Sequence, residues 1–180
     1  QMYKSILAIS EGGPEAAMSF RLAAMIAAMF DGTVDAVHFS ETHPGDADIA
    51  AQAMPFLKRV TDDRLNARAR ESERAFKELL SPLPGATFAG GHGVTREQLV
   101  TMGRFANLLL LGRPGTDAEH IAPETVRMAI YDCARPVVIA PPNPNHAPIS
   151  SVVVAWNGSA QAARAVGFAL PFLRKARTVT

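Results

Sequence analysis

The chain of 180 residues lacks several features that mark particular protein classes. It holds one cysteine, Cys133, so no disulfide can form within the chain, and the sequence suits a reducing compartment. No apolar run approaches the roughly 18 residues that a membrane-spanning helix needs. Neither sign of charge dominates, since 18 Lys and Arg face 17 Asp and Glu. These absences argue against a disulfide scaffold, a membrane protein and a nucleic-acid-binding protein.

The N-terminus lacks the charged-then-apolar layout of a signal peptide, and Met2 is the expected natural start. The expected location is therefore cytoplasmic. Apolar material is plentiful, because 48% of the residues are hydrophobic and only 19% are charged. This balance predicts a folded domain with a sizeable core.

Short β-type runs alternate with longer helical patterns along residues 2–141. The expected strands are 3–9, 33–39, 86–90, 108–111 and 136–140. The longest helical pattern runs from about residue 49 to residue 80, Thr95 with Gln98 forms a capping box, and Pro123 suits a first helical turn. This α/β alternation predicts an open five-stranded parallel sheet with helices on both faces. The expected core residues are Ile6, Leu7, Val37, Leu109, Leu110 and Val138.

The end of the chain repeats its beginning. Residues 151–159 align without gaps on residues 5–13, and Gln161-Ala162-Ala163 matches Glu15-Ala16-Ala17. A period near 146 residues indicates domain duplication. We expect a first unit at 2–141, a Pro-rich linker at 142–148, and the first strand and helix of a truncated second unit at 149–180. The apolar faces of that strand and helix require cover from another copy or from further residues.

Five segments resemble the universal stress protein family. They are Lys4-Ser5-Ile6-Leu7 with the acidic-glycine turn after it, and residues 36–39, 106–112, 135–139 and 154–159. The resemblance implies a sheet in the order 3-2-1-4-5, and units paired through sheet edges as homodimers or tandem pseudo-dimers. It also implies a stress-response or regulatory module that is not an enzyme.

ATP-binding members of that family resemble one another at three places, which map onto this sequence. Glu11 follows the first strand, where an aspartate that reaches the adenine is expected, and Phe39 ends the second strand. Gly112-Arg113-Pro114-Gly115 follows the fourth strand, where two glycines bring backbone N–H groups to the phosphates. Thr125-Val126 opens the next helix. The resemblance thus implies an adenine nucleotide as ligand, held by these seven residues: Glu11, Phe39, Gly112, Arg113, Gly115, Thr125 and Val126.

Three departures from the family pattern predict a degenerate ATP site. Glu11 has one methylene more than aspartate, Pro114 has no N–H, and Glu124 stands where a glycine is expected. A carboxylate at Glu124 is expected to satisfy the helix N-terminus and to repel a triphosphate. The preferred function is a regulatory module that acts through dimerisation and small-ligand binding. The alternative is an ATP-binding universal stress protein with slow ATP hydrolysis.

Two further segments are interpreted as structural. Gly90-Gly91-His92-Gly93 is expected as a flexible turn after the third strand, with His92 near the nucleotide crevice as the alternative. A polar loop lacks the spacing of a structural zinc site, so a solvated loop is favoured over a metal site. Its candidate ligands are Glu41, His43, Asp46 and Asp48.

Three sets of side chains have ordinary structural interpretations. His38 lies in a strand and is expected to be a packed core histidine. Cys133 follows the inner stripe of a helix with Val126, Ala129 and Ile130, which predicts a buried, inert thiol. Four arginines of the long helix are expected on its exposed face, with a protein-contact patch as the alternative. These are Arg64, Arg68, Arg70 and Arg74.

Overall fold

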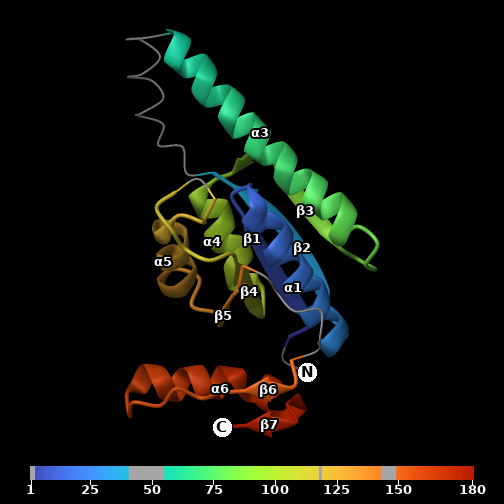
Figure 1. Cartoon of the computed structure of the whole chain (residues 1–180), viewed down its shortest axis with the longest axis vertical. Helices are drawn as coiled ribbons and strands as arrows, with labels where there is room; N and C mark the ends of the chain where they lie inside the picture. The colour runs from blue at the N-terminus through green and yellow to red at the C-terminus, as the bar shows by residue number, and fades with distance from the viewer. Residues whose placement is uncertain (1–2, 41–54, 118, 143–148) are drawn as a thin grey trace. The chain divides into compact units, whose positions relative to one another are not determined.

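A five-stranded parallel sheet forms the centre of the first unit (Figure 1). The computed structural model describes residues 3–40, 55–117, 119–142 and 149–180. The strands are β1 (Ser5–Ser10), β2 (Thr33–Phe39), β3 (Thr87–Val94), β4 (Leu108–Leu111) and β5 (Val137–Ile139). Their order is β3-β2-β1-β4-β5, and every pairing is parallel. The predicted fold class, strand order and strand directions are confirmed.

Helices cover both faces of this sheet (Figure 1). The described helices of the first unit are α1 (Pro14–Phe30), α3 (Pro55–Leu79), α4 (Arg96–Phe105) and α5 (Pro123–Tyr131). Helices α1 and α3 pack together on one face, and α4 and α5 lie on the other. Alternate strand residues such as Leu7, Val37 and Leu109 form a core with Leu99 of α4 and Met128 of α5. The described helices are too short or too polar to cross a membrane.

The local signals at the starts of elements act as expected. Thr95 accepts a hydrogen bond from the Gln98 N–H, and the Gln98 side chain accepts one from the Thr95 N–H, which completes the capping box. Pro123 occupies the first turn of α5. The two strands β1 and β4 are aligned by Asn107, whose Oδ1 accepts from the N–H groups of Lys4 and Ser5, both at 3.1 Å.

Three predictions need correction, and a fourth lies partly outside the described residues. The glycine-rich segment 90–93 lies within the bounds of β3 rather than in a turn after it, at an irregularity where the register with β2 shifts between Ala89 and Val94. Val138 is only partly buried, since β5 is an edge strand. Ile130 is exposed because α5 turns Met128 and Ala129 inward instead. The long helix α3 begins at Pro55 in the described part of the chain, and residues 49–54 lie outside it, as does the polar loop at 41–48.

The second unit, described over residues 149–180, is a βαβ segment. It consists of β6 (Ser151–Val152), α6 (Ala160–Lys175) and β7 (Thr178–Val179), and the two strands pair in parallel. The Ser159 hydroxyl caps α6 by accepting from the Ala162 N–H at 3.1 Å. Strand β6 ends at Val152, and beyond it the Val154 N–H donates to the Thr180 carbonyl at 2.7 Å. Residues 143–148 of the expected linker lie outside the described part of the chain.

Candidate functional site

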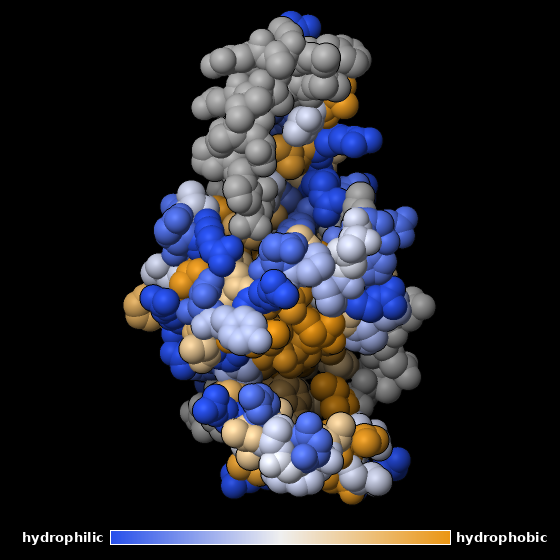
Figure 2. All heavy atoms as spheres, turned by 90° about the vertical axis from the view of Figure 1, so that its left-hand side faces the viewer, coloured by the Kyte–Doolittle hydropathy of each residue, from blue (hydrophilic) through white to orange (hydrophobic). Residues whose placement is uncertain are grey.

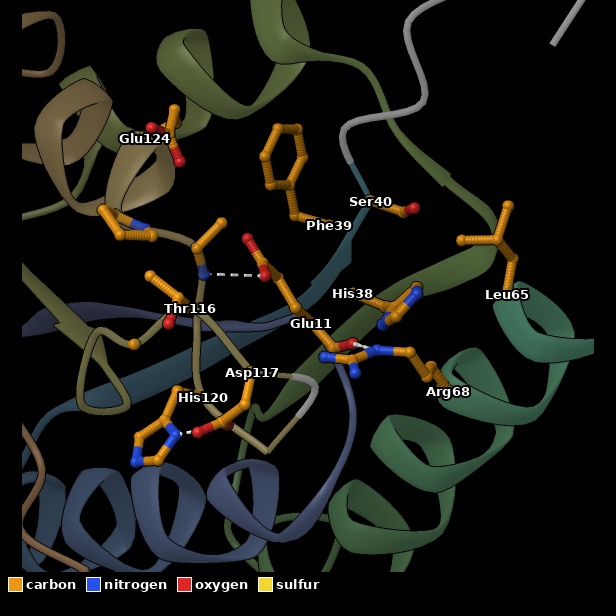
Figure 3. A pocket seen from close by; sticks show the side chains of 13 residues that line it. Glu11, His38, Phe39, Ser40, Leu65, Arg68, Thr116, Asp117, His120 and Glu124 are labelled. Atoms are coloured by element: carbon orange, nitrogen blue, oxygen red, sulfur yellow. Dashed lines mark hydrogen bonds and ion pairs between the residues drawn. The ribbon is translucent and has the colours of Figure 1, made fainter. Parts of the chain in front are cut away.

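A pocket of about 560 Å³ opens at the carboxyl ends of β1 and β2 (Figure 3). This is the edge at which open parallel sheets bind ligands, and the volume lies in the range of small-molecule sites. The lining residues come from the ends of these strands, from α3, and from the loop between β4 and α5. They are Glu11, His38, Phe39, Ser40, Leu65, Arg68, Gly115, Thr116, Asp117, His120, Ala122, Pro123 and Glu124.

The side chain of Glu11 stands in the middle of this pocket and holds the start of α5 (Figure 3). Its Oε2 accepts from the backbone N–H of Ala122 at 2.9 Å, and its Oε1 accepts from the Thr125 hydroxyl at 2.5 Å. The first N–H groups of a helix have no partner within the helix and attract anions. Glu11 therefore satisfies part of this N-terminus, and the N-cap residue Ala122 offers no side-chain cap. Glu124 lies in the first turn of α5, and the charge effect expected of it stays a prediction.

In the loop between β4 and α5, the N–H groups of Arg113 and Gly115 donate to the protein itself. The N–H of Arg113 donates to the Glu15 carboxylate of α1 at 3.2 Å, and the N–H of Gly115 donates to the Ile121 carbonyl at 3.1 Å. Pro114, between them, has no N–H. A phosphate cradle needs several backbone N–H groups that point at the ligand. At these three positions the loop presents none to the pocket.

The side chain of His120 packs against the same loop. The His120 ring packs on Gly115, where an added Cβ would lie 2.5 Å from the ring carbon Cγ. Its Nε2 accepts from the Arg113 guanidinium at 2.9 Å, because arginine can only donate. The proton therefore sits on Nδ1, which donates to Asp117 at 2.5 Å and holds the pKa of that carboxyl below its ordinary value. These two hydrogen bonds fix the His120 ring and engage both of its nitrogens.

A buried polar chain supports the opposite side of the pocket. The N–H of Gly12 donates to the Ser10 hydroxyl at 3.0 Å, Ser10 contacts Ser72 at 2.8 Å, and Ser72 contacts His38 Nδ1 at 2.9 Å. With Ser10 donating to Ser72 and Ser72 donating to Nδ1, every hydroxyl hydrogen has a partner and His38 carries its hydrogen on Nε2. Burial lowers the pKa of His38 to about 4, and the charge of Arg68 adds to this effect. His38 is thus uncharged at neutral pH, and its predicted core position is confirmed.

Helix α3 is fastened to the end of β1 by two polar contacts. Arg68 Nε donates to the backbone carbonyl of Glu11 at 2.6 Å, and Glu71 accepts from the N–H of Gly13 at 2.7 Å. Arg64, Arg70 and Arg74 are exposed as expected, but Arg68 is partly buried and lines the pocket. The partial burial of Arg68 could have been predicted from the sequence. Arg68 lies beside the helical stripe of Leu65, Ala69 and Ser72, which turns toward the sheet.

The seven candidate residues fall into three groups. Glu11, Phe39 and Gly115 line the pocket. Thr125 is buried beneath it and reaches it through Glu11, while Gly112 and Arg113 belong to the loop beside it. Val126 packs against the hydrophobic core. The sequence interpretation missed Arg68, Asp117 and His120, because their role depends on contacts between distant elements.

The described residues contain no cluster of three or more side chains suited to a metal ion. Cys133 is buried, as predicted, and burial raises the pKa of its thiol. A thiol in this state is a poor nucleophile.

Comparison with known proteins relates the chain to one family of solved structures. No protein-family model and no curated protein matches the sequence. The universal stress protein UspA from Lactobacillus plantarum superposes with a TM-score of 0.55 at 18% identity, over 78% of this chain and 99% of that chain. A universal stress protein from Archaeoglobus fulgidus gives 0.44 at 12% identity, over 77% and 98%. A universal stress protein in complex with cAMP gives 0.46 at 16% identity, over 79% and 100%. The first of these superpositions shows that the chain has the universal stress protein fold.

Proposed function

We propose that the chain is a universal stress protein-like module that acts in a stress response or its regulation. It works by pairing with a similar unit and by binding a small ligand in the pocket, and it is not an enzyme. The observation that carries this proposal is the closed loop between β4 and α5. The N–H groups of Arg113 and Gly115 are engaged by the protein, Pro114 has none, and Glu11 occupies the N-terminus of α5. The pocket is retained, but its phosphate corner is filled by the chain's own acceptors.

Catalysis is unsupported by the geometry of the described residues. Ser72 contacts His38, but Ser72 is fully buried and does not line the pocket. His120 has both ring nitrogens engaged, so it is not poised to accept a proton from a substrate. A nucleophile beside an available base, which group transfer needs, is missing from the described lining.

Pairing is supported by two apolar edges. In the first unit, β5 is an edge strand, and Ile139 on it and Ile130 on the adjacent helix are exposed. Apolar side chains gather on the side of the molecule formed by α5 and β5 (Figure 2). In the second unit, Val153 is 77% exposed and Trp156 61% exposed. Exposed edges and large exposed apolar side chains favour association with another strand or chain.

A tandem origin is supported by the backbone as well as by the repeated sequence. Gly12 and Gly158, which are 146 positions apart in the alignment, both have positive φ, at 86° and 76°. In each unit a glycine turn of this kind lies between a strand and a helix, and the next strand pairs in parallel with the first. The residues that match Leu7 and Ser10 are Val153 and Trp156. Leu7 and Ser10 are buried in the first unit, whereas their counterparts are exposed.

Thermal unfolding of the purified chain with and without millimolar ATP tests the ligand part of this proposal. A ligand that binds the native state raises its stability by mass action. We expect ATP to leave the unfolding temperature nearly unchanged. A large increase would favour the alternative, an ATP-binding universal stress protein with slow hydrolysis, and an assay for released phosphate would then decide whether hydrolysis occurs.

A further inference from the structure

The charge of the chain is divided unevenly between its two units. Residues 149–180 hold four basic residues and no Asp or Glu, whereas residues 1–148 hold 14 Lys and Arg against 17 Asp and Glu. The net charge of +1 therefore conceals a formal charge of +4 on the second unit and −3 on the rest of the chain. A charge asymmetry of this kind is typical of parts that bind nucleic acid or membranes. The four basic residues are Arg164, Arg174, Lys175 and Arg177.

Two of these basic residues stand where the first unit has apolar residues. At spacings of four and three residues, one face of α6 carries a stripe of Arg164, Phe168, Pro171 and Lys175. At the offset of the repeat, this stripe aligns with Met18, Leu22, Met25 and Met29 of α1. The four α1 side chains are buried or half-buried, and α1 packs against α3. Both charged ends of the α6 stripe are exposed. Because an unpaired buried charge is costly, this face of α6 does not suit the packing of another apolar helix.

Large apolar side chains are exposed on the same unit. Phe168 and Leu170 are exposed on α6, and Val153 and Trp156 are exposed between β6 and α6. Basic residues mixed with exposed aromatic and aliphatic side chains are typical of segments that lie in a membrane interface, where tryptophan is enriched. The aliphatic side chains favour a membrane over a nucleic acid, because single-stranded nucleic acids bind by stacking on aromatic rings and offer valine and leucine no apolar phase.

We propose that the second unit binds the surface of an anionic lipid bilayer. Its basic residues contact the lipid phosphates, and Trp156, Phe168 and Leu170 enter the headgroup region. Arg164 and Lys175 are eleven positions apart on α6, which is about 16 Å along a helix, so a flat anionic surface can contact both at once. Each basic residue near such a surface strengthens binding about fivefold. The surface shares no residue with the pocket of the first unit.

Flotation of the full chain with lipid vesicles tests the inference. Phosphatidylglycerol vesicles should carry the chain, phosphatidylcholine vesicles should not, and added salt should release it because salt screens the charges. Trp156 is the single tryptophan of the chain, so its emission should shift to shorter wavelength when it enters the headgroup region. No flotation with phosphatidylglycerol, equal flotation with phosphatidylcholine, or flotation without the emission shift overturns the inference.

Two soluble polyanions separate lipid from other anionic partners. Polyuridylate offers phosphates with bases, and polyglutamate offers carboxylates on a peptide. At equal concentrations of negative charge, we expect neither to displace the chain from phosphatidylglycerol vesicles, because neither provides an apolar phase for the exposed side chains. Displacement by polyuridylate would overturn the inference in favour of a nucleic acid, and displacement by polyglutamate would overturn it in favour of an acidic protein.

A matched pair of variants locates the binding surface. Arg164→Gln with Lys175→Gln removes two charges from the stripe on α6, so binding to phosphatidylglycerol vesicles should weaken more than about tenfold. Arg21→Gln with Arg127→Gln removes two charges from α1 and α5 of the first unit and should change binding less than about twofold. All four positions are exposed, so both proteins should keep the parent fold. Equal losses in the two variants would show an effect of net charge alone and overturn the role of the second unit.

Discussion

The Glu11 carboxylate and the Ala122 N–H lie 2.9 Å apart, although 111 positions separate the two residues in the sequence. This contact joins the end of β1 to the start of α5 and places a negative charge at the positive end of a helix. Removing it by Glu11→Ala should lower the free energy of unfolding by about 1–3 kcal/mol, because the Ala122 N–H and the Thr125 hydroxyl lose their acceptor. Urea titration measures this. Glu11→Gln keeps one acceptor oxygen, so its free energy of unfolding should fall less than that of Glu11→Ala. Full stability of Glu11→Ala would contradict the capping role.

The proposed degenerate ATP site predicts a gain of ATP binding on mutation. Pro114→Gly restores an N–H in the loop, and Glu124→Gly removes a like charge at the helix start. The double variant should bind ATP several-fold more tightly than the parent in calorimetry. The gain is limited, because the N–H groups of Arg113 and Gly115 stay engaged. Tight binding by the parent, or equal binding by both proteins, would count against this account.

His38 predicts a pH dependence of stability. Its pKa is about 4 in the folded chain and about 6.5 in the unfolded chain, so the unfolded state binds a proton first as the pH falls. The contribution of His38 to stability is complete above pH 6.5, declines between pH 6.5 and 4, and falls no further below pH 4. The total loss is at most about 3 kcal/mol. Urea unfolding across this range should give a shallower profile for His38→Asn, and parallel profiles would refute the assignment.

Gly12 is predicted to be intolerant of any side chain. Its φ is +86°, and a Cβ there would lie 2.6 Å from both Cβ and the carbonyl oxygen of Arg68. Gly85 has a similar φ of +72°, but the nearest atom to an added Cβ is a Thr33 methyl at 3.4 Å. Gly85→Ala should therefore show the backbone cost alone, about 1–2 kcal/mol. Gly12→Ala should lower the free energy of unfolding clearly more than Gly85→Ala, because α3 must move to make room for the new methyl group. Equal losses of stability in thermal unfolding of the two variants would disprove the close packing at Gly12.

The exposed side chains of the second unit predict association between chains. Val153→Lys with Trp156→Glu adds charge to two positions that are already exposed, so the fold should tolerate it. If this surface pairs chains, light scattering will show a smaller species than the parent. Ile139→Lys makes a comparable change on the β5 edge. Dissociation by Ile139→Lys alone would assign pairing to β5 instead, and a monomeric parent would contradict pairing altogether.

Local patterns were enough to predict most of the fold. Buried parallel strands such as β4 are continuous apolar runs, and caps such as Thr95 with Gln98 lie within a few residues of each other. The predictions were wrong where the sequence signal was weak or where a neighbouring element decided the structure. The glycines of β3 carry little strand propensity, and they lie where the register between β2 and β3 shifts. Ile130 is an apolar residue that the packing of α5 leaves outside.

By itself the sequence determined the parallel α/β architecture, because apolar strands and helix caps depend on residues close together in the chain. Only the tertiary structure decided which acceptors take the backbone N–H groups around the pocket. Glu11, Glu15 and Glu71 each accept a hydrogen bond from a backbone N–H of another element, at Ala122, Arg113 and Gly13. Such contacts follow from the register of the sheet and the packing of its helices, and no local spacing in the sequence encodes them.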